Sequence, residues 1–166
     1  LMPQLRSAGR LRSALLLSPP GGGKTTLLRD AARQLSLGGA QVAVVDERSE
    51  LAACLRGVPT LDVGPNTDVL DGCPKAEGMR LALRALSPAV IVTDELGHAR
   101  DVLAVREAAR CGVAVLASAH GDDFADAARR PMLRAVLAER AFERVIALRA
   151  PGRIAAVYDG GGKRLA

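Results

Sequence analysis

The chain has 166 residues, enough for one domain with a sizeable core, and its apolar content of 49% indicates a globular rather than a disordered protein. Aromatic residues make up only 2%, which nearly excludes the base-stacking platforms that bind single-stranded nucleic acid. The formal net charge of +5 comes with arginines scattered along the chain, a pattern that favours an arginine-rich composition over a dedicated nucleic-acid-binding surface.

Apolar runs and helical patterns alternate along the chain, which predicts an α/β fold with a mostly parallel sheet covered by helices. Strands are expected over residues 11–17, 41–46, 89–94 and 113–118. Helices are expected over residues 25–35, 49–55, 76–86, 99–111 and 122–139, with Pro131 breaking or restarting the last one. Glycine and proline make residues 57–75 a predicted long loop. Residues 144–148 and 153–158 flank Pro151-Gly152 as a predicted hairpin, and a frayed tail is expected over residues 160–166.

Residues 18–26 read Ser-Pro-Pro-Gly-Gly-Gly-Lys-Thr-Thr and stand between the first expected strand and the first expected helix. This order is typical of a phosphate-binding loop, in which N–H groups of glycines close around phosphate oxygens at the positive end of a helix. Lys24 would reach the β- and γ-phosphates, and the Thr25 hydroxyl would ligate Mg²⁺. The strict pattern has glycine where Ser18 stands, and the alternative interpretation is an unrelated glycine-rich turn. The predicted nucleotide-binding residues are Pro20, Gly21, Gly22, Gly23, Lys24, Thr25 and Thr26.

Two adjacent acids, Asp94 and Glu95, follow the apolar run of residues 89–93. Hydrolysis of a nucleoside triphosphate needs a carboxylate that holds Mg²⁺ through water and a base that activates the attacking water. Asp94 is predicted to take the first role and Glu95 the second. The alternative is that the two acids cap the next helix.

Polar residues also end the second and fourth expected strands, and the carboxyl ends of parallel strands open onto one edge of a sheet. Glu47 is therefore a candidate second catalytic carboxylate, beside the catalytic candidates Glu95 and Lys24, and Arg48 is a candidate phosphate or ribose contact. An ion pair at the sheet edge is the alternative for Glu47 and Arg48. His120 could sense the γ-phosphate, and the alternative there is a plain turn.

The remaining observations on the sequence predict no further site but narrow the class of protein, its location and its nucleotide. Cys54, Cys73 and Cys111 are odd in number and form no Cys-x-x-Cys pair, which favours reduced thiols in a cytosolic protein. No apolar run approaches the ~18 residues of a membrane-spanning helix, so any membrane role is expected to be peripheral. No Asn-Lys-x-Asp guanine-reading motif occurs, which favours ATP over GTP. An arginine that acts on a neighbouring subunit stays open among Arg80, Arg84, Arg100, Arg106, Arg130 and Arg153.

Five segments taken together resemble the stage III sporulation protein AA family, and the resemblance runs over nearly the whole chain. These segments are residues 18–30, 44–50, 67–75, 91–95 and 119–121. The most specific is residues 67–75, because no general argument about nucleotide sites predicts its Asp-Gly-Cys-Pro-Lys sequence. Ser18 is typical of this family, so the resemblance implies that the serine belongs to the phosphate loop.

The resemblance implies a RecA-like P-loop NTPase core, a three-layer sandwich related to type II and type IV secretion and pilus motors. It implies that the strand ending at Ser118 lies between the loop strand and the Asp94 strand, and it supports a catalytic role for Glu47. Residues 1–166 would form a single ATPase domain, without the N-terminal domain that family members usually carry.

The function implied by the resemblance is that of a Mg²⁺-dependent ATPase, the motor of a sporulation-specific secretion or channel complex. Its partners would be copies of itself in a ring, hexameric by analogy, and membrane channel proteins at the mother-cell face of the inner membrane. Two alternatives stay open. One is a nucleotide-gated assembly scaffold with little turnover, and the other is a motor stimulated by nucleic acid, although nucleic acid is not expected as a partner.

Overall fold

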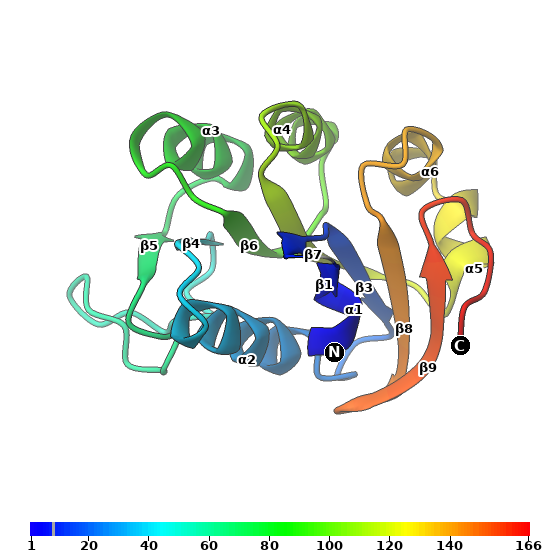
Figure 1. Cartoon of the computed structure of the whole chain (residues 1–166), viewed down its shortest axis with the longest axis horizontal. Coiled ribbons are helices and arrows are strands. Elements are labelled where there is room, and N and C mark those ends of the chain that lie inside the picture. Colours follow the sequence, from blue (N-terminus) through cyan, green and yellow to red (C-terminus); the bar gives the residue numbers. More distant parts are fainter. Residues whose placement is uncertain (8) are drawn as a thin grey trace.

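One seven-stranded sheet organises the chain in the computed structural model, which describes residues 1–7 and 9–166 (Figure 1). Its strands are β3 (Ala14–Ser18), β4 (Val42–Asp46), β5 (Thr67–Asp71), β6 (Val90–Glu95), β7 (Ala114–His120), β8 (Arg144–Ala150) and β9 (Arg153–Asp159). Their order across the sheet is β5-β4-β6-β7-β3-β8-β9. All neighbouring strands run parallel except β8 and β9, which form the predicted antiparallel hairpin.

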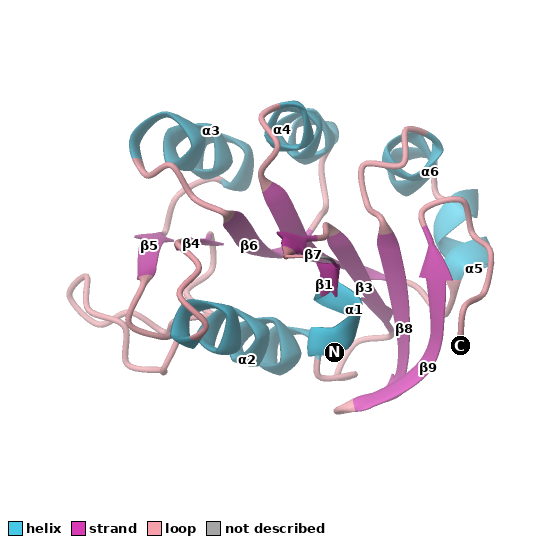
Figure 2. Ribbon diagram, viewed as in Figure 1, coloured by secondary structure: helices cyan, strands magenta, loops and turns pink. Residues whose placement is uncertain are grey.

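Helices cover both faces of this sheet and complete three layers (Figures 1 and 2). The helices are α1 (Met2–Leu5), α2 (Lys24–Leu37), α3 (Lys75–Ala85), α4 (Ala99–Arg110), α5 (Phe124–Arg129) and α6 (Pro131–Ala138). In Figure 1, α3, α4 and α6 lie on one face and α2 lies on the other with α1. Pro131 starts α6, so the expected break in the long C-terminal helical segment is confirmed.

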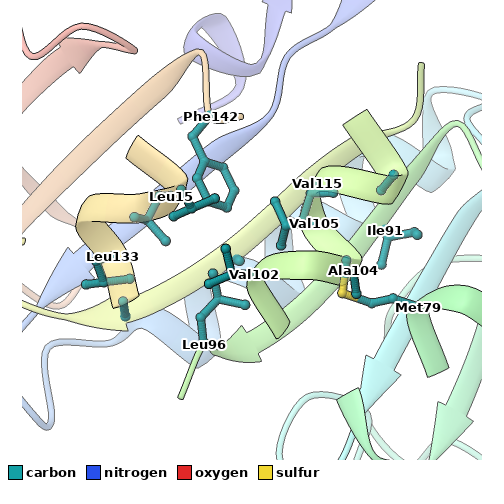
Figure 3. Packing of buried hydrophobic residues seen from close by; sticks show 14 of the residues in the cluster. Leu15, Met79, Ile91, Leu96, Val102, Ala104, Val105, Val115, Leu133 and Phe142 are labelled. Atoms are coloured by element: carbon teal, nitrogen blue, oxygen red, sulfur yellow. The ribbon is translucent and has the colours of Figure 1, made fainter. Parts of the chain in front are cut away.

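The buried strands are continuous apolar runs because both of their faces pack against helices. Successive residues point to opposite faces, so Leu15 and Leu17 of β3 join one core and Leu16 joins the other. Figure 3 shows the core between the sheet and α3, α4 and α6, where Phe142 and Leu133 pack near Leu15. With so few aromatic residues, leucine, valine, isoleucine and alanine supply most of both cores.

No helix within residues 1–7 and 9–166 combines the length and the apolar character that crossing a bilayer requires.

The helix expected over residues 49–55 is wrong, because a side chain takes over the backbone donors of this segment. The Asp46 carboxylate accepts hydrogen bonds from the N–H groups of residues 50–52 at distances between 2.8 and 2.9 Å. Ser49 and Ala53 have φ angles of 55° and 47°, in the left-handed region. A buried acceptor thus competes with the helical hydrogen bonds that the local sequence would allow.

Three further expectations about secondary structure are corrected. The predicted loop over residues 57–75 contains β5, an edge strand that pairs in parallel with β4. Its polar residues do not show the apolar pattern by which the other strands were predicted. The first strand is divided, since β2 (Arg10–Leu11) pairs with β1 (Arg6–Ser7) and only β3 enters the main sheet. The C-terminal tail is not frayed, because the Leu165 N–H donates to the Val157 carbonyl at 2.7 Å.

Helix α3 lies close to β4 at Gly78. A Cβ atom at this position would lie 2.6 Å from Cγ1 of Val45 and 3.3 Å from Sγ of Cys73. Overpacking of a buried contact costs about 1–3 kcal/mol, whereas alanine returns at most about 1 kcal/mol of helix propensity. We therefore expect Gly78→Ala to lower the free energy of unfolding by about 1 kcal/mol, as measured by urea denaturation.

Gly97→Ala is the matched control, because a Cβ atom there would meet nothing within 4 Å. Equal losses in the two variants, or a stabilised Gly78→Ala protein, would contradict the close approach of α3 to β4.

Candidate functional site

The carboxyl ends of β4, β6, β7 and β3 lie side by side along one edge of the sheet, because these four strands are parallel neighbours. Glu47 follows β4, Glu95 ends β6, His120 ends β7 and Ser18 ends β3. The placement of β7 between β3 and β6 confirms the strand order that the resemblance implied. An edge of this kind is where α/β sheets bind their ligands.

A cavity of about 430 Å³ opens at this edge, and all seven predicted nucleotide-binding residues, 20–26, line it. Asp94, Glu95 and His120 line the same cavity from the neighbouring strands. Arg48 also borders it, as the prediction of a phosphate or ribose contact requires. The structure therefore brings the loop and most of the predicted site residues around one space, which we call the phosphate cavity after the role predicted for the loop.

Each glycine of the loop is required by the local backbone for a distinct reason. Gly21 and Gly23 have φ angles of 75° and 80°, which L side chains rarely adopt. Gly22 meets Ser18 so closely that a Cβ atom would lie 2.2 Å from the serine Oγ. The resulting loop precedes Lys24, the first residue of α2. A cradle of backbone at a helix N-terminus suits phosphate oxygens, so the residues present fit a nucleotide's phosphates.

Ser18 anchors the loop lysine. Lys24 Nζ lies 2.9 Å from the Ser18 carbonyl oxygen, 3.1 Å from the Ser18 Oγ and 3.1 Å from the Pro19 carbonyl oxygen. Burial lowers the pKa of Lys24, and the negative charge of Glu95 opposes that shift. The serine that departs from the strict phosphate-loop pattern thus contributes a hydroxyl contact that glycine could not make. Its position in the motif was visible in the sequence, but this contact was not.

His120 connects the loop lysine to the predicted base. Its Nδ1 lies 3.4 Å from Lys24 Nζ, and its Nε2 lies 3.0 Å from Glu95 Oε1. An ammonium group can only donate a hydrogen bond and a carboxylate can only accept one, so a neutral imidazole here accepts at Nδ1 and donates from Nε2–H. The sensor role predicted for His120 stays a prediction, but the side chain contacts both groups that such a role would need.

A β-bulge in β6 brings two adjacent acids to the site. Val92 pairs with Leu116 of β7, whereas Glu95 pairs with Ser118, so β6 contains one extra residue over this stretch. Bulges of this kind redirect side chains and are common next to active sites. Here Asp94 is buried, and the Glu95 side chain is 41% exposed and reaches His120.

Lys75, which the sequence analysis did not single out, joins two of the predicted carboxylates. Its Nζ lies 2.8 Å from Asp94 Oδ1 and 3.1 Å from Glu47 Oε2. Burial by itself would lower the pKa of Lys75, but the contacts with Asp94 and Glu47 outweigh it and hold the pKa above its usual value. The only sequence signal for this residue was its place at the end of the Asp-Gly-Cys-Pro-Lys block.

Glu47 lies apart from the phosphate cavity. It borders a second hollow of about 760 Å³ at the starts of α3 and α4, together with Lys75, and it does not line the phosphate cavity. Its catalytic role stays a prediction, and its link to Asp94 runs through Lys75. None of the arginines left open for action in trans borders the phosphate cavity within the described chain.

The structure brings the two residues predicted to hold Mg²⁺ to the same cavity, and their role as metal ligands stays a prediction. Thr25 and Asp94 both border the phosphate cavity. Asp94 Oδ1 is buried and, apart from its ion pair with Lys75, has no aligned hydrogen-bond donor. Across residues 1–7 and 9–166, no group of three or more His, Cys, Asp or Glu side chains could hold a metal by itself. A divalent ion here would therefore also depend on water and phosphate oxygens, which is how Mg²⁺ binds in nucleotide sites.

Known proteins resemble this chain in sequence and in fold. Residues 1–165 match the family model described as Sporulation stage III, protein AA. Stage III sporulation protein AA of Bacillus subtilis (strain 168) is 44% identical over 173 residues, which cover 99% of this chain and 56% of that protein.

Two solved ATPases share the fold. The ATPase DotB of Legionella pneumophila superposes with a TM-score of 0.63 at 23% identity, over 81% of this chain and 40% of that one. The VirB11 ATPase of the Brucella suis type IV secretion system, solved with sulphate, superposes with a TM-score of 0.61 at 18% identity, over 89% of this chain and 48% of that one. The chain thus has the α/β fold of P-loop ATPases and spans about half the length of these relatives.

Asp46 and Glu47 are neighbours in sequence but make different contacts, and a substitution of Asp46 tests its structural role. Asp46 is fully buried and holds the N–H groups of residues 50–52. We expect Asp46→Ala to lower the free energy of unfolding by about 3 kcal/mol, because it leaves backbone donors without acceptors. Denaturation in guanidinium chloride measures this loss, and the exposed Asp122→Ala is the control. An Asp46→Ala protein as stable as the wild type would contradict the structural role of Asp46.

Proposed function

This chain belongs to the sporulation stage III protein AA family, and we propose that it hydrolyses ATP with Mg²⁺ to drive a sporulation-specific secretion or channel complex. The observation that carries the proposal is the single cavity in which the phosphate loop meets Asp94, Glu95 and His120. The shared fold with DotB and VirB11, both ATPases, supports it. A loop alone would bind phosphate, whereas these acids add the groups that hydrolysis needs.

The binding part of the reaction falls to the loop. The N–H groups of residues 21–25 surround the β- and γ-phosphates, and Lys24 exchanges its contacts with the Ser18 and Pro19 carbonyl oxygens for phosphate oxygens. Thr25 and, through water, Asp94 would hold Mg²⁺. When bound, the metal neutralises charge on the β- and γ-phosphate oxygens.

Glu95 acts as the base. Its carboxylate accepts a proton from water as that water attacks the γ-phosphorus, the bond to the β,γ-bridging oxygen breaks, and ADP leaves with phosphate. His120 Nε2–H holds Glu95 in place from 3.0 Å, and the same imidazole contacts Lys24. This double contact lets His120 sense the γ-phosphate, because phosphate that draws Lys24 away also frees Nδ1.

The complete motor is a ring, hexameric by analogy, at the mother-cell face of the inner membrane and docked on channel proteins. The small number of basic side chains at the site supports a ring. Lys24 and Arg48 are the basic side chains that border the phosphate cavity within the described residues, so an arginine from a neighbouring copy would complete the neutralisation of the γ-phosphate. The likeness to an ATPase of a type IV secretion system supports the membrane complex.

Steady-state hydrolysis by site variants tests the enzymatic proposal. We expect Glu95→Gln to lower kcat at least 100-fold while nucleotide affinity is retained, because a neutral amide cannot take the proton from water. Lys24→Ala is expected to weaken binding of a non-hydrolysable ATP analogue by roughly 10- to 100-fold, from the loss of a charged hydrogen bond. Lys163→Ala and Glu77→Gln, both exposed, are the controls.

Equal hydrolysis rates in the wild type, Lys24→Ala and Glu95→Gln proteins would remove the ATPase proposal. A wild type that forms rings with the non-hydrolysable analogue, yet turns over ATP no faster than Glu95→Gln, would instead identify an assembly scaffold.

A further inference from the structure

We infer that Lys75 is a positioning residue of the nucleotide site, which pins Asp94 at the wall of the phosphate cavity and ties Glu47 to it. This inference rests on the proposed function, since the metal-holding role of Asp94 is part of that proposal. It assigns a task to a residue of the Asp-Gly-Cys-Pro-Lys block that the phosphate loop and the acid pair leave unexplained.

The ion pair between Lys75 and Asp94 separates two cavities. Lys75 lines the hollow at the starts of α3 and α4 but not the phosphate cavity, whereas Asp94 lines the phosphate cavity but not that hollow. Lys75 therefore contacts Asp94 from the side opposite to the phosphate cavity. Its Nζ engages Oδ1 at 2.8 Å, which leaves Oδ2 as the carboxylate oxygen that Lys75 does not hold.

Local structure alone does not account for a lysine here. Lys75 is the first residue of α3, where the positive end of the helix dipole disfavours a cation. It is also only 5% exposed, and burying an ammonium group is unfavourable unless carboxylates pair with it. The two carboxylates that pair with it come from other elements, Asp94 from β6 and Glu47 from the segment after β4. The lysine is thus held by the site rather than by its helix.

The backbone before Lys75 turns so that its side chain reaches Asp94 and Glu47. Gly72 has a φ angle of 63° directly after β5, and Pro74 provides the N-cap position of α3. Gly78, one turn further on, lets α3 lie against Val45 of β4. This short segment therefore turns from the edge strand into a helix whose first side chain lies between β4 and β6.

A residue that holds a metal through water must itself be oriented, and groups behind such ligands typically change metal affinity by about 10–100-fold when they are removed. Asp94 has no aligned hydrogen-bond donor at Oδ1, so its ion pair with Lys75 is the contact that restrains this oxygen within the described residues. Without Lys75, Asp94 would be a buried carboxylate with no paired cation and freer to rotate away from the cavity.

The test is a Mg²⁺ titration at a fixed concentration of a fluorescent, non-hydrolysable ATP analogue. We expect Lys75→Met to raise the half-saturating Mg²⁺ concentration about 10-fold and to leave binding of the analogue in EDTA unchanged, because the loop and Lys24 are intact. Lys75→Arg, which keeps the charge, should fall between Lys75→Met and the wild type. Lys163→Met is the matched control, since Lys163 is exposed.

Two results would overturn the inference. An unchanged half-saturating Mg²⁺ concentration in Lys75→Met, even with a lower Tm, would mean that Lys75 is only structural. A lowered value would mean that Lys75 competes with the metal instead of positioning its ligand. If Lys75→Met does not fold, Lys75→Gln replaces it. Its neutral amide can still donate to Asp94 but carries no charge, so an increase smaller than that of Lys75→Met, and still above the wild-type value, is expected. A wild type whose analogue binding ignores Mg²⁺ would instead remove the proposed function, and with it the role of Lys75.

A measurement without nucleotide checks the ion pair itself. The chain has three lysines, Lys24, Lys75 and Lys163, so their side-chain ammonium signals can be assigned by NMR from the variants above. We expect the Lys75 ammonium protons to exchange slowly with water, because Asp94 and Glu47 hold them, and those of Lys163 to exchange fast. Fast exchange at Lys75 would overturn the inference whatever the titration gave.

Discussion

The parallel pairing of β4, β6, β7 and β3, in that order, is the constraint on which the site depends. Parallel strands end at the same edge, so a polar residue at each end lies beside those of the neighbouring strands. The crossovers that parallel pairing requires place helices on both faces, which is why the strands themselves are apolar throughout. Polar chemistry is thereby confined to the strand ends and to the loops that follow them.

Charge compensation organises that edge into two arrays. In one, Glu95, His120 and Lys24 are linked by contacts of 3.0 and 3.4 Å, and in the other Lys75 lies between Asp94 and Glu47. Buried charged groups are tolerated when each has a partner, and here Lys24 faces the Ser18 and Pro19 carbonyl oxygens while Lys75 faces Asp94 and Glu47. Under the proposed function, a phosphate that enters the cavity would also replace existing contacts of Lys24.

The errors in the predicted secondary structure share one cause, which is that local patterns do not report a distant or side-chain partner. Residues 49–55 have a helical pattern, but the Asp46 carboxylate captures their N–H groups. β5 forms because the backbone of β4 provides hydrogen-bonding partners for it, although the polar residues of β5 suggest a loop. The tail is ordered because Val157 of β9 has free backbone groups to pair with residues 165 and 166.

The sequence by itself determined the glycine-rich turn before Lys24, the acids at the strand ends and the alternating α/β order, because these are local patterns of glycine placement, residue type and periodicity. It also contained the block that ends at Lys75, without any local reason for it. Only the tertiary structure decided which partner each acid has. The Asp46 carboxylate accepts from backbone N–H groups, and Glu47 borders a separate hollow. Lys75 contacts Asp94 from the side away from the phosphate cavity. Such pairings depend on the order of strands across the sheet and on the approach of α3 to β4, and both are set by contacts between segments far apart in the chain.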